Sequence, residues 1–237
     1  MNTNTILAPP ATASQIAVEN PPIIPAGLEV DANLSLLTEP HSLAAEAVRA
    51  LRTQIVARHV DAGRRALAMV APTVDCGLTT LSINLAVALA QTGIRTLLVD
   101  ADLRKPSITS ALGIAGNAGL SGVLNGQVPY LDDVIVRDVV ANLAILPAGN
   151  CAEKPHELLA SARFRQVVRE TMREYDLTIY DTSPANLSPD AIAVANAAGY
   201  CAIASRRDHS YSNDVRTLSG QLNDAGTVVI GTVLNVF

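Results

Sequence analysis

The sequence predicts an α/β domain with a central, mostly parallel sheet that helices cover on both faces. Short aliphatic runs alternate along the chain with helical stretches, which is the pattern of βαβ units. Apolar residues make up 49% of the 237 residues and aromatic residues only 3%. The core is therefore aliphatic, as expected for a parallel sheet buried on both faces. The length fits one large α/β domain or at most two small ones.

The first 38 residues differ from the rest of the chain. Prolines lie among small and polar residues there, and no period of 2 or 3.6 is sustained. Such a segment buries too little surface to offset its ordering entropy, so residues 1–38 are predicted to be a flexible, acidic tail. The folded domain is predicted over residues 39–237. It opens with a helix over 42–59, with Ser42 as its cap and Gly63 beyond its end.

Strands and helices then alternate to the end of the chain. Strands are predicted at 66–71, 95–99, 143–147, 177–180, 200–205 and 227–236, and helices at 79–92, 156–174, 188–197 and 212–225. Gly93, Gly199 and Gly226 lie where helices should stop. In open parallel sheets the ligand site lies outside the carboxyl ends of the strands, so the residues that follow each strand are candidate site residues.

Charge and cysteine content exclude several functions. The formal charge of −5 comes from five acidic residues before Arg49, a stretch without Lys or Arg; the remainder carries 17 basic and 22 − 5 = 17 acidic residues. No basic face for nucleic acid or polybasic membrane anchor is predicted. The three cysteines lack the spacing of a metal site. With no signal peptide and no run of about 18 apolar residues, we expect a cytoplasmic protein without direct membrane insertion.

The turn at residues 72–80 lies between a predicted strand and a predicted helix, where a phosphate-binding P-loop belongs. Against the pattern G-x-x-x-x-G-K-[ST], Gly77 and Thr79 match, but Leu78 stands at the lysine position. Taken alone, this turn favours an ordinary strand–helix connection.

Carboxylates follow two other strands. Asp100 and Asp102 come after the run that ends at 99, and Asp181 follows the run that ends at 180. A carboxylate at a strand end can hold Mg²⁺, although any one of these residues alone would be assigned to a helix cap or turn. Three at the same edge, facing a turn in P-loop position, predict a nucleotide site by descent.

These stretches together resemble the cytoplasmic domain of the bacterial tyrosine autokinases (BY-kinases) of capsular and exopolysaccharide synthesis, relatives of the MinD and ParA ATPases. The resemblance runs from about Pro40 to Phe237, with Asp190 also matching. The matching segments are EAVRALRT (46–53), NLAVALAQTGIRTLLVDADLRKP (84–106), GLSGVLNG (119–126), LAILPAG (143–149), ELLASARFRQVV (157–168), YDLTIYDTSPA (175–185) and GTVLN (231–235). Their combination is far more specific than a phosphate-loop pattern.

The resemblance implies a P-loop NTPase-like fold that uses Mg-ATP or Mg-ADP, and it implies roles for individual residues. The phosphate loop would contain Gly77, Thr79 and Thr80, and Asn235 would read the adenine. The catalytic acidic pair would be Asp100 and Asp102, which binds metal and activates the attacking hydroxyl, and Asp181 would be the second-motif carboxylate. The implied magnesium ligands are Thr79, Asp100 and Asp181, and the implied ring-forming helix face carries Glu46, Arg49 and Arg52. Without the rest of the match, that helix face would be assigned to solvent.

The sequence also departs from the family pattern P-G-E-G-K-[ST]. Leu78 cannot donate to the phosphates, and Asp75 stands where a glycine backbone should wrap them. A unit charge about 6 Å from a phosphate charge costs on the order of 3 kcal/mol at an effective dielectric of 20. The family's tyrosine cluster after the last strand is also missing from the given sequence, which stops at Phe237.

Three hypotheses follow. The main hypothesis is a catalytically degenerate BY-kinase-like regulator of exopolysaccharide polymerisation or export. It would form homo- or hetero-oligomers with the cytoplasmic segment of a membrane polysaccharide co-polymerase and lie peripheral to the inner membrane through that partner. The first alternative is an active tyrosine autokinase with an atypical loop, in which Arg104 or Lys105 replaces the missing cation. The second is a MinD- or ParA-like positioning ATPase, disfavoured by the absence of loop lysines.

Overall fold

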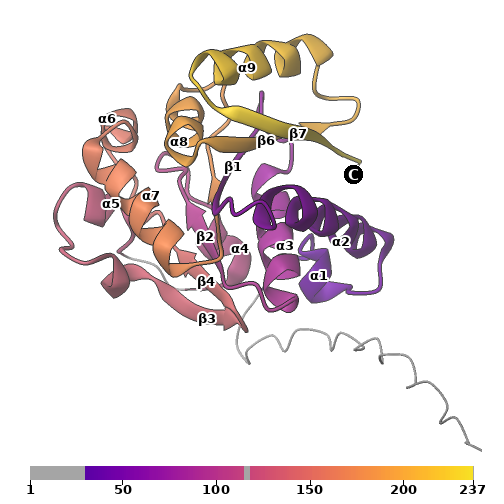
Figure 1. Cartoon of the computed structure of the whole chain (residues 1–237), viewed down its shortest axis with the longest axis horizontal. Coiled ribbons are helices and arrows are strands. Elements are labelled where there is room, and N and C mark those ends of the chain that lie inside the picture. The colour runs from indigo at the N-terminus through magenta and orange to yellow at the C-terminus, as the bar shows by residue number, and fades with distance from the viewer. Residues whose placement is uncertain (1–29, 115–117, 237) are drawn as a thin grey trace, which may run out of the picture.

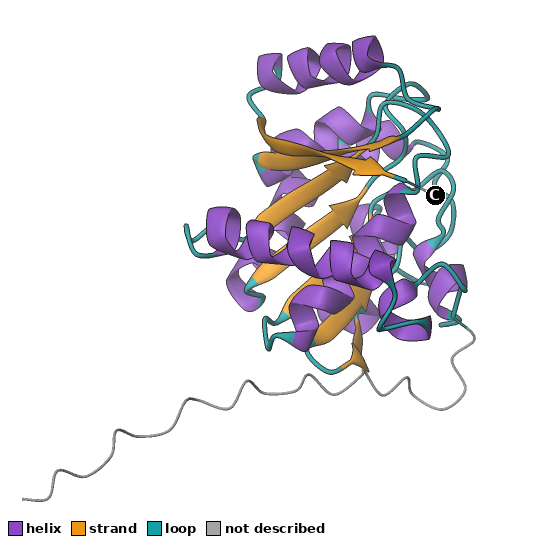
Figure 2. Ribbon diagram, turned by 90° about the vertical axis from the view of Figure 1, so that its right-hand side faces the viewer, coloured by secondary structure: helices purple, strands orange, loops and turns teal. Residues whose placement is uncertain are grey.

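A computed structural model describes residues 30–114 and 118–236. These residues form a seven-stranded sheet with the order β3-β4-β2-β5-β1-β6-β7. All neighbouring strands are parallel except β3 and β4. The strands are β1 (Ala66–Val70), β2 (Thr96–Asp100), β3 (Val136–Val140), β4 (Leu143–Leu146), β5 (Leu177–Asp181), β6 (Tyr200–Arg206) and β7 (Val228–Asn235). The predicted fold class is confirmed, and Figure 2 shows the strands between two layers of helices.

The sheet divides the core into two halves because successive strand residues point to opposite faces. In β1, Leu67 and Met69 belong to one half of the core, and Ala66, Ala68 and Val70 to the other. The first half is covered by α1 (Ser35–Thr38), α2 (Leu43–Ile55), α3 (Leu78–Gln91) and α4 (Ile108–Leu112). The second is covered by α5 (Leu120–Leu124), α6 (Pro155–Leu159), α7 (Ala162–Glu174), α8 (Asp190–Ala198) and α9 (Ser212–Asp224), as Figure 1 shows. No helix of the described residues has the length and apolar character needed to cross a membrane.

Two serine caps set helix starts. The Ser42 hydroxyl accepts from the amide of Ala45 at 3.2 Å, so α2 begins where the sequence predicts. The Ser161 hydroxyl accepts from the amide of Phe164 at 3.1 Å and starts α7. The single helix predicted over 156–174 is therefore wrong: α6 ends at Leu159, and the chain turns before Ser161 starts a second helix.

Residues 34–38 pack with the domain, although the domain was predicted to begin at residue 39. Leu34, Leu36 and Leu37 are buried, and the amide of Leu36 donates to Asn84 Oδ1 at 3.1 Å. Three leucines within four residues form a small apolar face that packs on α3. This part of the predicted tail is therefore structured, and residues 1–29 lie outside the described residues.

The α2 helix packs on α3, and both belong to the half of the core on the same face of the sheet. Val48 and Ile55 are buried in this contact. The helix is followed by a π-helical turn, η1 (Val56–Val60), which brings the helical segment close to its predicted end at 59.

The edge strand β3 was not predicted, and neither was the 3-10 turn η2 (Leu131–Val134) before it. Within β3, Arg137 and Asp138 are exposed, and Asp138 has a left-handed backbone with φ of 53°. The antiparallel pairing with β4 is irregular at this point. A short strand with a charged, bulged centre has no aliphatic run or alternation for a sequence pattern to detect.

Candidate functional site

The ends of β2 and β5 bring two carboxylates together. Asp100 and Asp181 are the last residues of these strands and pair directly in the parallel register. Both side chains are buried, with 0% and 1% exposure. Asp100 Oδ2 accepts from the amides of Ser107 and Ile108, each at 3.1 Å. Two of the three predicted carboxylates therefore share one buried position at the expected sheet edge.

Both carboxyl groups have raised pKa values. Burial, which disfavours the charged form, raises the pKa of Asp100 to about 6, although the amides of Ile108 and Ser107 oppose this. Burial together with the negative charge of Asp100 raises the pKa of Asp181 to about 7. The pair therefore holds less than two full negative charges near neutral pH, and a cation placed between the groups would favour their ionised forms.

Two hydroxyl groups donate to Asp181, and a third donates to one of these two. Thr79 Oγ1 donates to Asp181 Oδ2 at 2.7 Å, and Ser82 Oγ donates to Oδ1 at 2.7 Å. Ser107 Oγ donates to Thr79 Oγ1 at 3.2 Å. Thr79 was predicted from the sequence, but both serines were missed. Ser82 follows Thr79 by three residues and so lies on the same helix face, a signal that could have found it.

The Asp102 carboxylate is bonded to the turn that follows β2. The Asp102 amide donates to Asp100 Oδ1 at 3.2 Å, while its own carboxylate accepts from the amides of Arg104 and Lys105 at 3.1 and 3.0 Å. In this structure the Asp102 carboxylate closes the turn after β2, which is the structural role that an aspartate at a strand end has without a ligand site. Its catalytic role stays a prediction.

The loop at residues 72–77 connects β1 to α3. Gly77 has a left-handed backbone with φ of 70° and precedes the first residue of α3, and Asp75 is also left-handed with φ of 56°. Leu78 is only 7% exposed and belongs to the same core cluster as Leu81. The side chain at the lysine position therefore packs in the core.

Arg104 is engaged by a buried carboxylate. Its Nε donates to Asp190 Oδ2 at 2.6 Å, and His156 Nδ1 lies 3.4 Å from Asp190 Oδ1. This hydrogen bond raises the pKa of the Arg104 guanidinium above its usual value. Asp190 is 2% exposed in its side chain, so removing Arg104 would leave a buried charge with only a half-exposed histidine beside it. The alternative in which Arg104 replaces the missing lysine is therefore disfavoured, because this side chain is already bound to Asp190.

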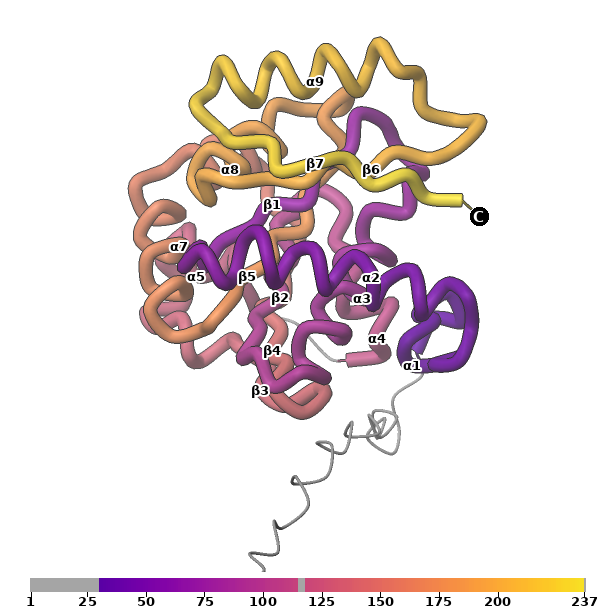
Figure 3. The backbone as a smooth tube through the Cα atoms, turned by 45° about the vertical axis from the view of Figure 1, so that its right-hand side comes forward, coloured from indigo at the N-terminus to yellow at the C-terminus, as the bar shows by residue number. Residues whose placement is uncertain are grey.

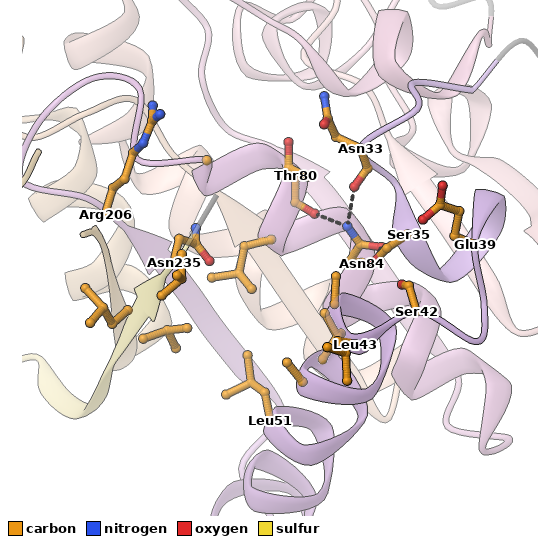
Figure 4. Close-up of a pocket in the computed structure, with 18 of the residues that line it drawn as sticks. Asn33, Ser35, Glu39, Ser42, Leu43, Leu51, Thr80, Asn84, Arg206 and Asn235 are labelled. Carbon is orange, nitrogen blue, oxygen red and sulfur yellow. Dashed lines mark hydrogen bonds between the residues drawn. The ribbon is translucent and has the colours of Figure 1, made fainter. Parts of the chain in front are cut away.

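A cavity of about 1070 Å³ adjoins the loop, between α2 and the end of β7. These two elements lie close to each other in Figure 3. Figure 4 shows Arg206 and Asn235 on one side of the cavity, Asn84 on the other, and Thr80 between them. The Thr80 carbonyl accepts from Asn84 Nδ2 at 2.9 Å. Asn235 Nδ2 donates to the Cys76 carbonyl at 2.7 Å, so this amide bonds the loop; adenine reading stays a prediction.

The predicted ring-forming face of α2 makes contacts within the chain. Arg49 donates to Glu46 Oε1 at 2.6 Å and to the Pro40 carbonyl at 2.8 Å, and its side chain is only 18% exposed. Arg52 Nη1 donates to the Ala88 carbonyl at 3.5 Å. Glu46 is 65% exposed in its side chain and is the member of this face most open to a neighbour.

The residues fit magnesium better than they fit a triphosphate. Thr79, Asp100 and Asp181 offer the hydroxyl and carboxylate oxygens that Mg²⁺ prefers. Among the described residues no group of three or more His, Cys, Asp or Glu side chains is arranged to hold a metal ion. Leu78 supplies no donor for the phosphates of a triphosphate.

A parallel sheet, a strand–loop–helix turn with a threonine after it, and carboxylates at adjacent strand ends define the class of P-loop NTPase-like proteins. A family model described as "AAA domain" matches residues 69–218. The chain is 33% identical over 172 residues to the tyrosine-protein kinase YwqD of Bacillus subtilis, covering 73% of this chain and 72% of that protein. The protein belongs to the family of bacterial tyrosine kinases.

Solved structures agree with this assignment. The kinase domain of the Escherichia coli tyrosine kinase ETK superposes with a TM-score of 0.82 at 30% identity, covering 86% of this chain and 79% of that chain. The septum site-determining protein MinD from Pyrococcus horikoshii, complexed with Mg-ADP, has a TM-score of 0.63 at 26% identity, covering 72% and 70%. Some other curated relatives are longer than this chain, and the chain matches only 26% of the length of one of them.

Proposed function

We propose that this protein is a catalytically degenerate BY-kinase-like regulator of exopolysaccharide polymerisation or export. In this proposal it acts by docking onto the cytoplasmic segment of a membrane polysaccharide co-polymerase. The observation that carries the proposal is Leu78: the side chain at the lysine position of the phosphate loop is 7% exposed and packs in the core. The loop therefore has no lysine to stabilise charge on a transferring phosphoryl group.

The state of Arg104 supports the same proposal. A cation that compensates for Leu78 has to reach the loop, and Arg104 is held at 2.6 Å by the buried carboxylate of Asp190. The retained Thr79, Asp100 and Asp181 fit an ancestor that bound Mg²⁺ with a nucleotide. Binding of Mg-ADP without transfer is compatible with this proposal.

The decisive experiment incubates purified protein with Mg²⁺ and ATP and follows phosphotyrosine and released phosphate. We expect no autophosphorylation and negligible hydrolysis, with Asp100→Ala as the matched control that sets the background. A phosphotyrosine signal that disappears in Asp100→Ala would overturn the degenerate assignment and favour the active autokinase.

The assembly part of the proposal is tested by light scattering coupled to gel filtration, with and without the partner's cytoplasmic segment. Arg49 is bonded within the chain, so its substitution would disturb folding as well as any interface. Glu46→Gln removes the most exposed charge of the α2 face while its amide oxygen can still accept from Arg49, so it is the better probe. We expect it to shift the oligomer toward monomer. Equal masses for wild type and variant in every condition would remove the assembly role from this helix.

A further inference from the structure

Three consecutive carbonyl oxygens of the loop each accept a hydrogen bond from a side chain at the end of β6 or β7 or in the turn that follows β6. The pairs are Val74 O with His209 Nε2 at 2.9 Å, Asp75 O with Arg206 Nη1 at 3.1 Å, and Cys76 O with Asn235 Nδ2 at 2.7 Å. Arg206 and Asn235 are the last residues of the neighbouring strands β6 and β7 and pair in register. The end of one sheet edge therefore holds the loop by its backbone.

These bonds also orient the amide groups of the loop. All peptide bonds of the described residues are trans, and in a trans peptide the N–H points opposite to the C=O. Holding the three carbonyls toward β6 and β7 therefore turns the N–H groups of Asp75, Cys76 and Gly77 the other way. The Cys76 amide closes the hydrogen-bonded turn at Val74 and Asp75, whereas no acceptor within residues 30–114 or 118–236 takes a hydrogen bond from the amides of Asp75 and Gly77. These two amides stay available for an anion of the phosphate class.

The side chain of Cys76 ties the loop to the same region. Its Sγ lies 3.3 Å from Ser210 Oγ, in the turn that follows β6, and the residue is 1% exposed. The Ser210 hydroxyl in turn accepts from the amide of Arg206 at 2.9 Å. A loop that moved away from β6 and β7 would expose this thiol.

We propose that Arg206, His209 and Asn235 form a carbonyl clamp, a set of positioning residues that holds loop 72–77 with its amides turned toward an anion in the absence of nucleotide. Leu78 offers the loop no charged contact, and the clamp supplies its polar anchoring from the opposite side. The choice of anion rests on the proposed function. The clamp itself is tested on the ligand-free protein, so the outcome of the autophosphorylation experiment does not affect it.

Cysteine labelling measures the clamp directly. In a Cys151→Ser background, which removes the exposed cysteine, the remaining thiols are Cys76 in the loop and Cys201 in the core. Asn235→Asp keeps the side-chain size but loses the donor, and His209→Ala removes a second bond. We expect the two changes together to raise the labelling rate of Cys76 on the order of tenfold, as two lost hydrogen bonds imply.

Two controls separate loop opening from general destabilisation. Arg207→Ala removes an exposed arginine close to His209 and should leave the labelling rate of Cys76 unchanged. His209→Gln keeps an N–H donor and should restore slow labelling relative to His209→Ala. An unchanged Cys76 rate in the double variant would overturn the clamp. A parallel rise at Cys201 would also overturn it, because the whole sheet and not the loop would then be opening.

Discussion

The buried carboxyl pair predicts that the folded state loses stability as pH rises. An aspartate carboxyl ordinarily has a pKa of 3.8, and burial raises the pKa of Asp181 to about 7 in the folded state, so the native state binds this proton more tightly than the unfolded chain does. The stabilisation from this proton is complete below pH 4 and is lost as pH rises through about 7. Three pKa units correspond to at most about 4 kcal/mol.

Asp181→Asn tests this reasoning, because the amide stays neutral at every pH. In urea unfolding with EDTA present, we expect wild type to lose about 2–4 kcal/mol more than the variant between pH 4.5 and pH 8. Asp176→Asn is the control that should leave the slope in this window unchanged, because the hydrogen bond from Arg95 lowers the pKa of Asp176 from 3.8 and that stabilisation is lost only at lower pH. Equal pH slopes for wild type and Asp181→Asn would show that the buried pair does not hold an extra proton.

Three other predictions concern the loop, the first helix and the Arg104 pair. Asp75→Gly with Leu78→Lys should raise Mg-ATP affinity at least about tenfold in titration calorimetry; a folded double variant that binds no better would show a site decayed beyond these two residues. Leu36→Ala should cost about 2–4 kcal/mol in urea unfolding, and a loss below about 1 kcal/mol would contradict its role in the core. Arg104→Gln should cost about 1–3 kcal/mol, most of it recovered by Asp190→Asn in a double-mutant cycle; additive losses would contradict the pairing.

The central sheet was predictable from the sequence because its buried strands are aliphatic on both faces. The run at 66–70 has no polar residue, and each predicted strand overlaps one in the structure. The meeting of Asp100 and Asp181 was also predictable, since both end parallel strands and such ends gather at one edge. The strand order was not, because no local pattern records that β5 lies between β1 and β2.

The contacts of the loop could not be predicted for a related reason. The bond from Asn235 to Cys76 joins residues 159 positions apart, and the bond from Arg104 to Asp190 joins residues 86 apart. Local propensity and spacing carry no information on such pairs. The resemblance supplied roles for Asn235 and Asp102, and only the geometry shows which backbone groups they contact in this chain.

The position of β5 has a consequence for how the chain folds. β1 and β2 precede β5 in sequence, yet they are not sheet neighbours, because β5 lies between them and pairs with both. During synthesis, two aliphatic strand edges must stay unpaired until residues 177–181 arrive, and Thr79 meets Asp181 only by closing a separation of 102 residues. Such long-range pairing slows folding and exposes strand edges that invite aggregation, so nascent chains that stop short of β5 should be the species that chaperones bind.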